Sequence, residues 1–291
     1  MKLKYIKTNT DNYQTVRAVL KQEFDLSARL ILKLKKSNNI FLNNESVYID
    51  KCISVGDIIS VNIDFDEDNS NIIPTKMELD ILYEDEYLLI VNKPAGMPVH
   101  PSCDHYEDSL SNGVKYHFDI QGLNKKIRPV NRLDKNTSGV VIFAKNEYVQ
   151  EKLSSQMLNK QFQKEYIAIC DGIFDEKSGT ISANIKRKNE SIIERCVNES
   201  GQSAITHYNV LEEKNNISKV QLFLETGRTH QIRVHMAYIG HPIIGDDLYG
   251  KPSSLINRQA LHAYKVKFAH PITNKQINII AQLPKDMELF K

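Results

Sequence analysis

The sequence lacks three features that would place it in specialised classes of protein. No stretch approaches the roughly 18 consecutive apolar residues that a membrane-spanning helix needs. The first residues contain no apolar core of a signal peptide, so we expect a chain that stays in the cytoplasm. The 4 cysteines are widely scattered and form no C-x-x-C pair. This indicates a reducing compartment and argues against a structural zinc site.

Cofactor-binding motifs are also missing. The sequence contains no Gly-rich phosphate loop, no nicotinamide fingerprint and no clustered metal ligands, so we expect no cofactor and no metal. His230 and His235 are five residues apart, off the four-residue spacing that puts two ligands on one helix face. With 291 residues, 41% of them hydrophobic and 25% charged, the chain has room for one large globular domain and a small one.

Net charge is small, at +2, and does not by itself indicate a nucleic-acid-binding protein. Its distribution is more informative. Residues 1–36 hold nine Lys or Arg against three Asp or Glu, whereas residues 37–80 hold two against nine. This asymmetry predicts a basic front surface followed by an acidic connector. Two ordinary solvated surfaces would give the same pattern.

A single carboxylate, Asp134, lies in a polar turn just before a continuous apolar run. Residues 139–144 (GVVIFA) are short, branched and uninterrupted, which predicts a strand buried on both faces. A strand held in this way fixes the turn that precedes it. An isolated Asp in a turn is usually only a turn residue that bonds its own backbone.

The surroundings of Asp134 point to a function. The string RLDKNTSG (132–139) with its apolar tail resembles the central motif of the RluA-type pseudouridine synthases. Four further stretches match that family in the family's order: NKPAGMPVHP (92–101), KEY (164–166), TGRTHQIRVH (226–235) and GHPIIGDDLYG (240–250). The resemblance covers about residues 79–282.

The resemblance implies an α+β fold. We expect a large catalytic domain on a mixed, mostly antiparallel sheet with flanking helices, the pseudouridine synthase fold, over residues 79–291. A small α+β domain similar to the S4 RNA-binding module is expected over residues 1–66, with an acidic linker at 67–78. The implied partner is structured RNA, with ribosomal RNA favoured and transfer RNA possible. We expect a monomer that needs no protein partner and no membrane.

The front segment shows two helical patterns before several short strands. Apolar spacing predicts a helix over residues 12–22 and a second helix from the N-cap Ser27 to about residue 36. Arg29, Lys33 and Lys36 share one side of the second helix, so we expect them to contact the phosphate backbone of folded RNA. Strands are expected at 40–42, 47–49 and 58–63. A packing module with solvated lysines is the alternative.

The larger part alternates strands with two helices. A hairpin is expected over residues 81–91, and further strands at 164–170, 180–185, 204–210, 219–224 and 261–268. The apolar spacing in residues 147–160 predicts an amphipathic helix whose inward-facing residues are Val149, Leu153, Met157 and Leu158. A second helix is expected to follow the turn at 226–229 and to reach about 239. Residues 186–188 and 195 are expected to form a basic loop.

The family chemistry assigns roles to residues in these motifs. Pseudouridine formation breaks the N1–C1′ bond of uridine, turns the base and rejoins it through C5, so one ionised carboxylate is needed, here Asp134. That carboxylate either attacks C1′ or abstracts the C2′ proton; the sequence does not discriminate these routes. Tyr166 would pack against the target base, although a core aromatic is the usual reading of a strand Tyr. Arg228 and Arg233 are the candidates to pair with Asp134, since a guanidinium keeps a carboxylate ionised and oriented.

Arg132 and Thr137 flank Asp134 and are expected to help hold the rearranged RNA. Asn131 departs from the family, in which many members have histidine, and we expect altered hydrogen bonding there with activity retained. Two other functions compete with this interpretation: a non-catalytic S4-like RNA-binding protein, and a hydrolase that uses Asp134 as nucleophile. The hydrolase would need a second carboxylate within reach, and the sequence shows no such pair.

Overall fold

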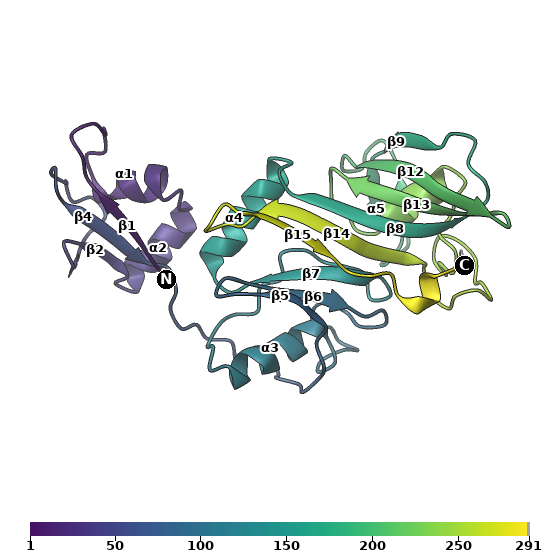
Figure 1. Cartoon of the computed structure of the whole chain (residues 1–291), viewed down its shortest axis with the longest axis horizontal. Coiled ribbons are helices and arrows are strands. Elements are labelled where there is room, and N and C mark those ends of the chain that lie inside the picture. Colours follow the sequence, from purple (N-terminus) through teal and green to yellow (C-terminus); the bar gives the residue numbers. More distant parts are fainter. Residues whose placement is uncertain (290–291) are drawn as a thin grey trace.

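The computed structural model describes residues 1–289 and shows an α+β protein with a small sheet, a large sheet and one separate two-stranded hairpin (Figure 1). A small sheet belongs to residues 1–63, here called the front unit, which has its own apolar core. A large sheet organises residues 81–289, here called the main unit. The expected fold class, a mixed sheet with flanking helices behind a small α+β unit, is confirmed.

The front unit packs two helical segments on a four-stranded antiparallel sheet of order β1-β4-β2-β3. The strands are β1 (Lys2–Ile6), β2 (Ile40–Leu42), β3 (Glu45–Ser46) and β4 (Ile58–Asn62), and the helices are α1 (Val16–Ala18), the π-helix η1 (Val19–Glu23) and α2 (Ala28–Lys36). As expected, Ser27 caps α2, because its Oγ accepts a hydrogen bond from Leu30 N at 3.1 Å. Leu30, Ile31 and Leu34 are buried.

Other expectations for the front unit were only partly correct. The strand expected at 47–49 is wrong, since β3 lies two residues earlier on the far side of the Asn43-Asn44 turn. The helix expected over 12–22 starts only at Val16, because Thr15 is extended and caps it. The sequence reasoning did not find β1, whose side chains alternate between exposed and half-buried and give a weak hydrophobic pattern.

The large sheet has nine strands, in the order β5-β6-β7-β14-β8-β13-β12-β9, with β15 also paired to β14. Among these strands only β7 and β14 run parallel; the other pairs are antiparallel. Their bounds are β5 (Ile81–Glu84), β6 (Leu88–Lys93), β7 (Ser138–Ala144), β8 (Gln163–Asp171), β9 (Ser178–Ser182), β12 (Ile205–Lys214), β13 (Ile217–Leu224), β14 (Leu261–Ala269) and β15 (Gln276–Ile280).

Strand β7 lies in the interior of this sheet, and all its residues are buried, as the apolar run 139–144 predicts. Gly139 is required at its start. Its φ is +114°, and a Cβ built there would lie 2.2 Å from the Ala263 carbonyl oxygen on β14. The close approach of β7 and β14 therefore depends on the missing side chain. This junction sets where the chain leaves the Asp134 turn.

Helices cover the sheet at three places: α3 (Leu110–Ile120), α4 (Glu147–Leu158) and α5 (Gln231–Tyr238), followed by the 3₁₀ turn η2 (Lys285–Met287) (Figure 1). Helix α3 was not expected, and α5 begins later than the turn at 226–229 suggested. Among the described residues, no helix combines the length and the apolar composition that a bilayer span requires.

Helix α4 differs from its predicted orientation at two positions. Leu158, expected inward, is 84% exposed. Tyr148 is buried and belongs to the core of the front unit. The reason is tertiary: α4 packs on the main sheet through Val149 and Leu153, while its first turn packs on the front unit. The basic segment expected as a loop is instead a hairpin of β10 (Ile185–Arg187) and β11 (Arg195–Val197).

We predict that Gly139→Ala destabilises the protein by about 3 kcal/mol, because the added methyl group meets backbone atoms that cannot move without separating β7 from β14. Urea unfolding measures this change. Gly122→Ala is the matched control: Gly122 also has a positive φ, of +69°, but nothing lies within 4 Å of its Cβ position. Equal losses for the two variants would show that backbone conformation alone, not the close approach, restricts Gly139.

We also predict a stability change at mildly acidic pH that depends on His262. Its ring contacts the Ser138 Oγ at 2.8 Å and the Ala281 carbonyl at 3.0 Å, and burial lowers its pKa to about 4. The unfolded chain takes up a proton near pH 6.5, so stability falls as the pH drops from 6.5 toward 4, by about 2 kcal/mol at pH 5. His262→Gln should lose less stability than wild type between pH 7 and pH 5. Identical losses in chemical denaturation would contradict the prediction.

Candidate active site

Asp134 lies in a tight turn whose backbone is fixed by buried cations. Thr137 N donates to the Asp134 carbonyl at 3.1 Å and closes the turn. Lys93 Nζ donates to the Lys135 carbonyl at 2.9 Å, and Arg258 Nη1 donates to the Asn136 carbonyl at 3.1 Å. The carbonyl groups inside the turn are thus bound from two sides. This arrangement holds the position of Asp134 independently of its own side chain.

Lys93, at the end of β6, is fully buried. Besides the Lys135 carbonyl, its ammonium group donates to the carbonyls of Pro94 and Met97, each at 2.7 Å. Burial, with a smaller contribution from the nearby Arg258, lowers the pKa of Lys93 to about 7, and Asp134 opposes this decrease. Lys93 therefore joins the irregular loop 93–101 to the turn that contains Asp134.

The segment before Asp134 is anchored to β7. Val130 N donates to the Ile142 carbonyl at 2.7 Å. The Asn131 amide then bonds the same strand twice: Nδ2 donates to the Val140 carbonyl and Oδ1 accepts from Ile142 N, both at 2.9 Å. The asparagine at this position therefore acts as a backbone bridge. Its side chain bonds β7 and makes no hydrogen bond to the Asp134 carboxylate.

Arg233 in α5 is the arginine that contacts the candidate carboxylate. Its Nη1 donates to Asp134 Oδ2 at 3.2 Å. The other candidate, Arg228, points elsewhere: its Nε donates to the Ser203 carbonyl at 3.0 Å. Ninety-nine residues separate Asp134 and Arg233 in the chain, so the fold and not local sequence brings them together.

Arg233 is itself held by a second carboxylate. Asp246, fully buried, accepts from Nε at 2.7 Å and from Nη2 at 2.8 Å, a bidentate pair. Burial alone would lower the pKa of Arg233, but the hydrogen bonds and attraction of Asp246, together with Asp134, raise it above its ordinary value. Asp246 Oδ1 also accepts from the backbone N–H groups of Leu248 and Tyr249. The guanidinium is therefore charged and fixed in orientation.

Asp134 and Tyr166 line one open cleft of about 860 Å³. Tyr166 lies on β8, buried between its neighbouring strands β13 and β14. Burial, and then the negative charge of Asp134, raise the pKa of Tyr166, so its phenol keeps its proton at neutral pH. The Asp134 carboxylate is 27% exposed and therefore open to the cleft. A flat ring and an accessible carboxylate at one cleft suit a planar base joined to a sugar.

The other candidates near Asp134 differ in exposure. Arg132 is exposed and lines the cleft. Thr137 is buried, and its hydroxyl accepts from Gln259 Nε2 at 3.3 Å, so it supports the turn. His235 is buried against Thr206 Oγ1 and the Ala183 carbonyl, each at 2.9 Å. Within residues 1–289 no group of three or more His, Cys, Asp or Glu is arranged to hold a metal ion.

Some residues that build the site were not singled out from the sequence. Lys93 and Asp246 lie inside two of the family-like motifs, but their roles depend on contacts that spacing does not reveal. Arg258 lies outside those motifs and gave no signal. The basic residues expected to contact RNA lie on α2, away from Asp134 and beside α4; they are Arg29, Lys33 and Lys36.

The chain is similar in sequence and in fold to proteins of one family. The family model described as RNA pseudouridylate synthase matches residues 87–238. The uncharacterized RNA pseudouridine synthase YhcT of Bacillus subtilis is 42% identical over 277 residues, which cover 94% of this chain and 91% of the relative. The ribosomal large subunit pseudouridine synthase D of Xylella fastidiosa is 32% identical, covering 94% and 86%.

The same enzyme of Neisseria meningitidis is 37% identical, covering 89% of this chain and 72% of the relative. Among solved structures, human RNA pseudouridylate synthase domain containing 1 superimposes with a TM-score of 0.59 at 28% identity, over 72% of this chain and 85% of that one. The matched segment contains Asp134, Tyr166 and Arg233. The chain therefore belongs to the RluA-type RNA pseudouridine synthases, the isomerases that convert uridine in RNA to pseudouridine.

Proposed function

We propose that this enzyme isomerises uridine in large-subunit ribosomal RNA, with Asp134 as the catalytic carboxylate. The observation that carries the assignment of Asp134 is its pairing with a guanidinium that a second, buried carboxylate holds in place. Such a pair fixes the orientation of the Asp134 carboxylate while it remains open to the cleft. The ribosomal substrate is supported by relatives that are named for the large ribosomal subunit and that cover most of the chain.

Both chemical routes use the same ionised carboxylate. In the nucleophilic route, an Asp134 oxygen attacks C1′ and the N1–C1′ electron pair leaves with the uracil. After the base has turned, C5 attacks C1′ and the carboxylate leaves again. In the glycal route, Asp134 takes the C2′ proton as the same bond breaks; C5 of the turned base then adds to C1′ of the glycal, and Asp134 returns the proton to C2′. In either route C5 finally loses its proton and N1 gains one.

Tyr166 is proposed as the residue that faces the reacting base. Its ring offers a surface for stacking, and its protonated hydroxyl offers a hydrogen bond to a displaced uracil. The target nucleotide must leave its stack to reach the cleft, at a cost of a few kcal/mol. Arg132 and Arg228, both exposed at the cleft, are proposed to bind the rearranged backbone. Thr137 is proposed to act only by supporting the turn.

The front unit is proposed to be an S4-like RNA-binding domain of residues 1–66, joined by a linker at 67–78 to the catalytic domain at 79–291. It is docked on α4. Ser27 Oγ donates to Glu151 at 2.6 Å, and Lys152 pairs with Asp25 at 2.7 Å. Tyr148 completes the docking by packing in the front core.

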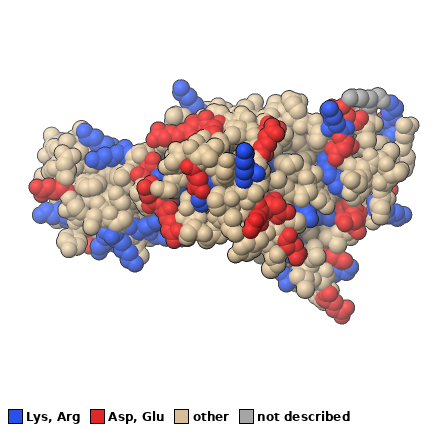
Figure 2. Space-filling model, turned by 90° about the horizontal axis from the view of Figure 1, so that it is seen from below, with Lys and Arg blue, Asp and Glu red and all other residues tan. Residues whose placement is uncertain are grey.

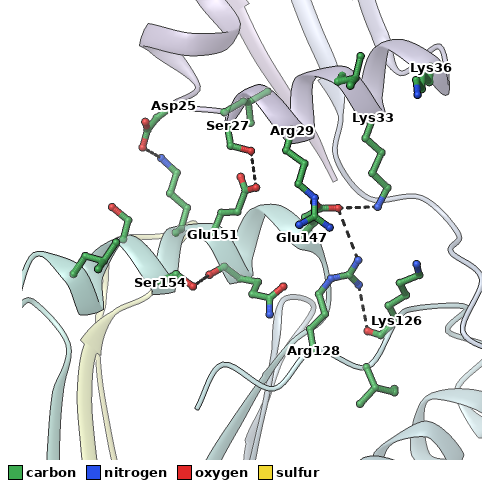
Figure 3. Close-up of a pocket in the computed structure, with 17 residues that line it drawn as sticks. Asp25, Ser27, Arg29, Lys33, Lys36, Lys126, Arg128, Glu147, Glu151 and Ser154 are labelled. Carbon is green, nitrogen blue, oxygen red and sulfur yellow. Dashed lines mark hydrogen bonds and ion pairs between the residues drawn. The ribbon is translucent and has the colours of Figure 1, made fainter. Parts of the chain in front are cut away.

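A groove of about 900 Å³ lies between α2 and α4 (Figure 3). The basic side chains proposed to contact RNA differ in how far their charges are already paired within the protein. Lys33 donates to Glu67 at 2.6 Å and to Glu147 at 2.8 Å, so its charge is already balanced within the protein. Arg29 is 88% exposed and makes one longer contact, of 3.4 Å, to Glu147. Lys36 is exposed on the last turn of α2.

Lys126 provides a further exposed cation on the catalytic side of the groove. The space-filling view shows Lys and Arg on the front unit next to Asp and Glu at its junction with the main unit (Figure 2). Ser154 and Leu158, on the last turns of α4, line both the groove and the Asp134 cleft. An RNA strand bound along Lys36 and Lys126 would therefore continue into the active site, with Lys33 serving to hold the domains together.

We predict that Asp134→Asn lowers the single-turnover rate of pseudouridine formation about a thousandfold or more, because the amide keeps the shape but loses the charge and the reactive oxygen. RNA affinity should change by less than about twofold, since no phosphate-binding cation is altered. The exposed Asp175 offers a matched control, Asp175→Asn, which should keep the rate. Product mass tests the reaction class: isomerisation leaves it unchanged, whereas hydrolysis frees a base. If Asp134→Asn kept a tenth of the wild-type single-turnover rate, Asp134 would not be the catalytic carboxylate.

We predict that Lys36→Gln and Lys126→Gln each weaken binding to a folded ribosomal RNA fragment and reduce the slope of log affinity against log salt by about one. Lys51→Gln is the control, because Lys51 is an exposed lysine of the front unit outside the groove. Catalysis on a short stem-loop that reaches only the cleft should be unaffected by all three substitutions. Equal effects of Lys36→Gln and Lys51→Gln would show that the groove is not the binding surface.

A further inference from the structure

His230, the residue just before α5, combines an unusual backbone with a position at the active site. Its φ is 58° and its ψ is 19°, the left-handed region that a side chain other than glycine or asparagine enters at a cost of about 1 kcal/mol. Its side chain makes no capping hydrogen bond to the helix. Instead, Nε2 lies 3.7 Å from Asp134 Oδ2. The strained backbone therefore places the imidazole at the carboxylate and does not serve to cap α5.

The other ring nitrogen of His230 is bound to Tyr249. His230 Nδ1 lies 2.8 Å from Tyr249 Oη, and the two rings pack edge to face with centroids 5.6 Å apart. Tyr249 Oη also accepts a hydrogen bond from the Arg195 backbone N–H at 2.8 Å. In addition, the Tyr249 ring lies 5.1 Å from the Arg233 guanidinium carbon. One tyrosine thus contacts both side chains that face Asp134 Oδ2.

These contacts determine which nitrogen of His230 carries the proton. Burial lowers the pKa of His230, so the ring is neutral at pH 7 and has one N–H group. If that proton were on Nδ1, the Nε2 lone pair would face the negative Asp134 oxygen. With the proton on Nε2, the N–H group faces the carboxylate and Nδ1 accepts the Tyr249 proton. Burial also raises the pKa of Tyr249, so its hydroxyl retains a proton to donate.

We propose that His230 is a positioning residue for the reaction: Tyr249 holds its Nε2–H tautomer, which directs this N–H at Oδ2 of Asp134 and leaves Oδ1 as the reacting oxygen. Arg233 also contacts Oδ2, so both donors address the same atom. Donors on Oδ2 would hold the carboxylate in one rotation and would stabilise it when it leaves C1′ or gives up its proton. This inference rests on the proposed role of Asp134.

The tautomer can be measured without any substitution. In the full chain labelled with ¹⁵N-histidine, the two ring nitrogens of a neutral histidine differ in chemical shift according to which one carries the proton. The proposal predicts a protonated Nε2 and a bare Nδ1 for His230 at pH 7, with the signal assigned by its loss in His230→Gln. Tyr249→Phe should shift this signal toward a tautomer mixture. A wild-type His230 protonated on Nδ1 would overturn the proposal.

The kinetic test separates positioning from general structural support. His230→Ala should lower the single-turnover rate about 10-fold, as expected for the loss of an N–H dipole that faces the carboxylate at 3.7 Å, with RNA affinity unchanged. His230→Gln, whose amide N–H can reach the carboxylate, should recover part of this loss. Tyr249→Phe, which keeps the ring beside Arg233, should lower the rate about tenfold. His117→Gln, a substitution on α3, is the control and should keep the wild-type rate.

The outcomes distinguish this inference from the proposed function. If Asp134→Asn is inactive while His230→Ala keeps the full rate, only the role of His230 is wrong. If Asp134→Asn remains active, the assignment of the carboxylate is wrong as well. If His230→Ala and His230→Gln lower the rate equally, and both bind RNA more weakly than the wild type, then His230 supports the fold and does not position Asp134. Recovery by Gln at unchanged affinity supports the proposal.

Discussion

The active site depends on one buried guanidinium that serves two carboxylates. Asp246 binds Arg233 through both of its oxygens and is completely buried, whereas Asp134 takes a single, longer hydrogen bond and remains open to the cleft. This inequality has a chemical consequence. Asp246 fixes the guanidinium in place, so in the proposed reaction Asp134 could lose its charge without releasing the guanidinium. Removing either partner of a buried pair leaves an uncompensated charge, a large penalty.

The position of Asp134 is fixed from two independent directions. Its backbone is held by β7 and by the buried cations Lys93 and Arg258, which bind carbonyl groups of the turn. Its side chain is addressed by α5 from the other side of the cleft. Since these contacts come from segments before and after β7 in the chain, the site forms only when the sheet is complete. Such support from several elements holds a reactive group in a productive geometry at little cost during the reaction.

Much of this arrangement follows from local sequence. The uninterrupted apolar run of β7 and the capping residue of α2 were predicted correctly, because strand burial and helix capping are local properties. The choice between Arg228 and Arg233 was not predictable. Both lie in one motif, and only the tertiary structure decides that Arg233 reaches Asp134 whereas Arg228 bonds the Ser203 carbonyl. Leu158 was misplaced for a related reason, because α4 ends at a groove and not on the core.

The docking of the front unit was likewise outside the reach of local patterns. Lys33 was expected to contact RNA from a basic helix face; in the structure two carboxylates, Glu67 and Glu147 of α4, surround its ammonium group. Burial alone would raise the pKa of Glu67, but the hydrogen bonds and positive charges of Arg128 and Lys33 lower it to about 2, so the carboxylate is charged at neutral pH. Segments that read as a free linker can thus be part of a buried ion-pair network that orients two domains.

The most direct test of the central claim is a map of pseudouridines in total cellular RNA from cells that carry the gene, lack it, or carry only the Asp134→Asn form. We expect one or a few uridines of large-subunit ribosomal RNA to be modified with the wild-type gene and the same positions to be unmodified in the other two strains. Loss at transfer RNA positions would correct the substrate while retaining the chemistry. Identical maps in all three strains would contradict the assignment of Asp134 and of the reaction to this chain.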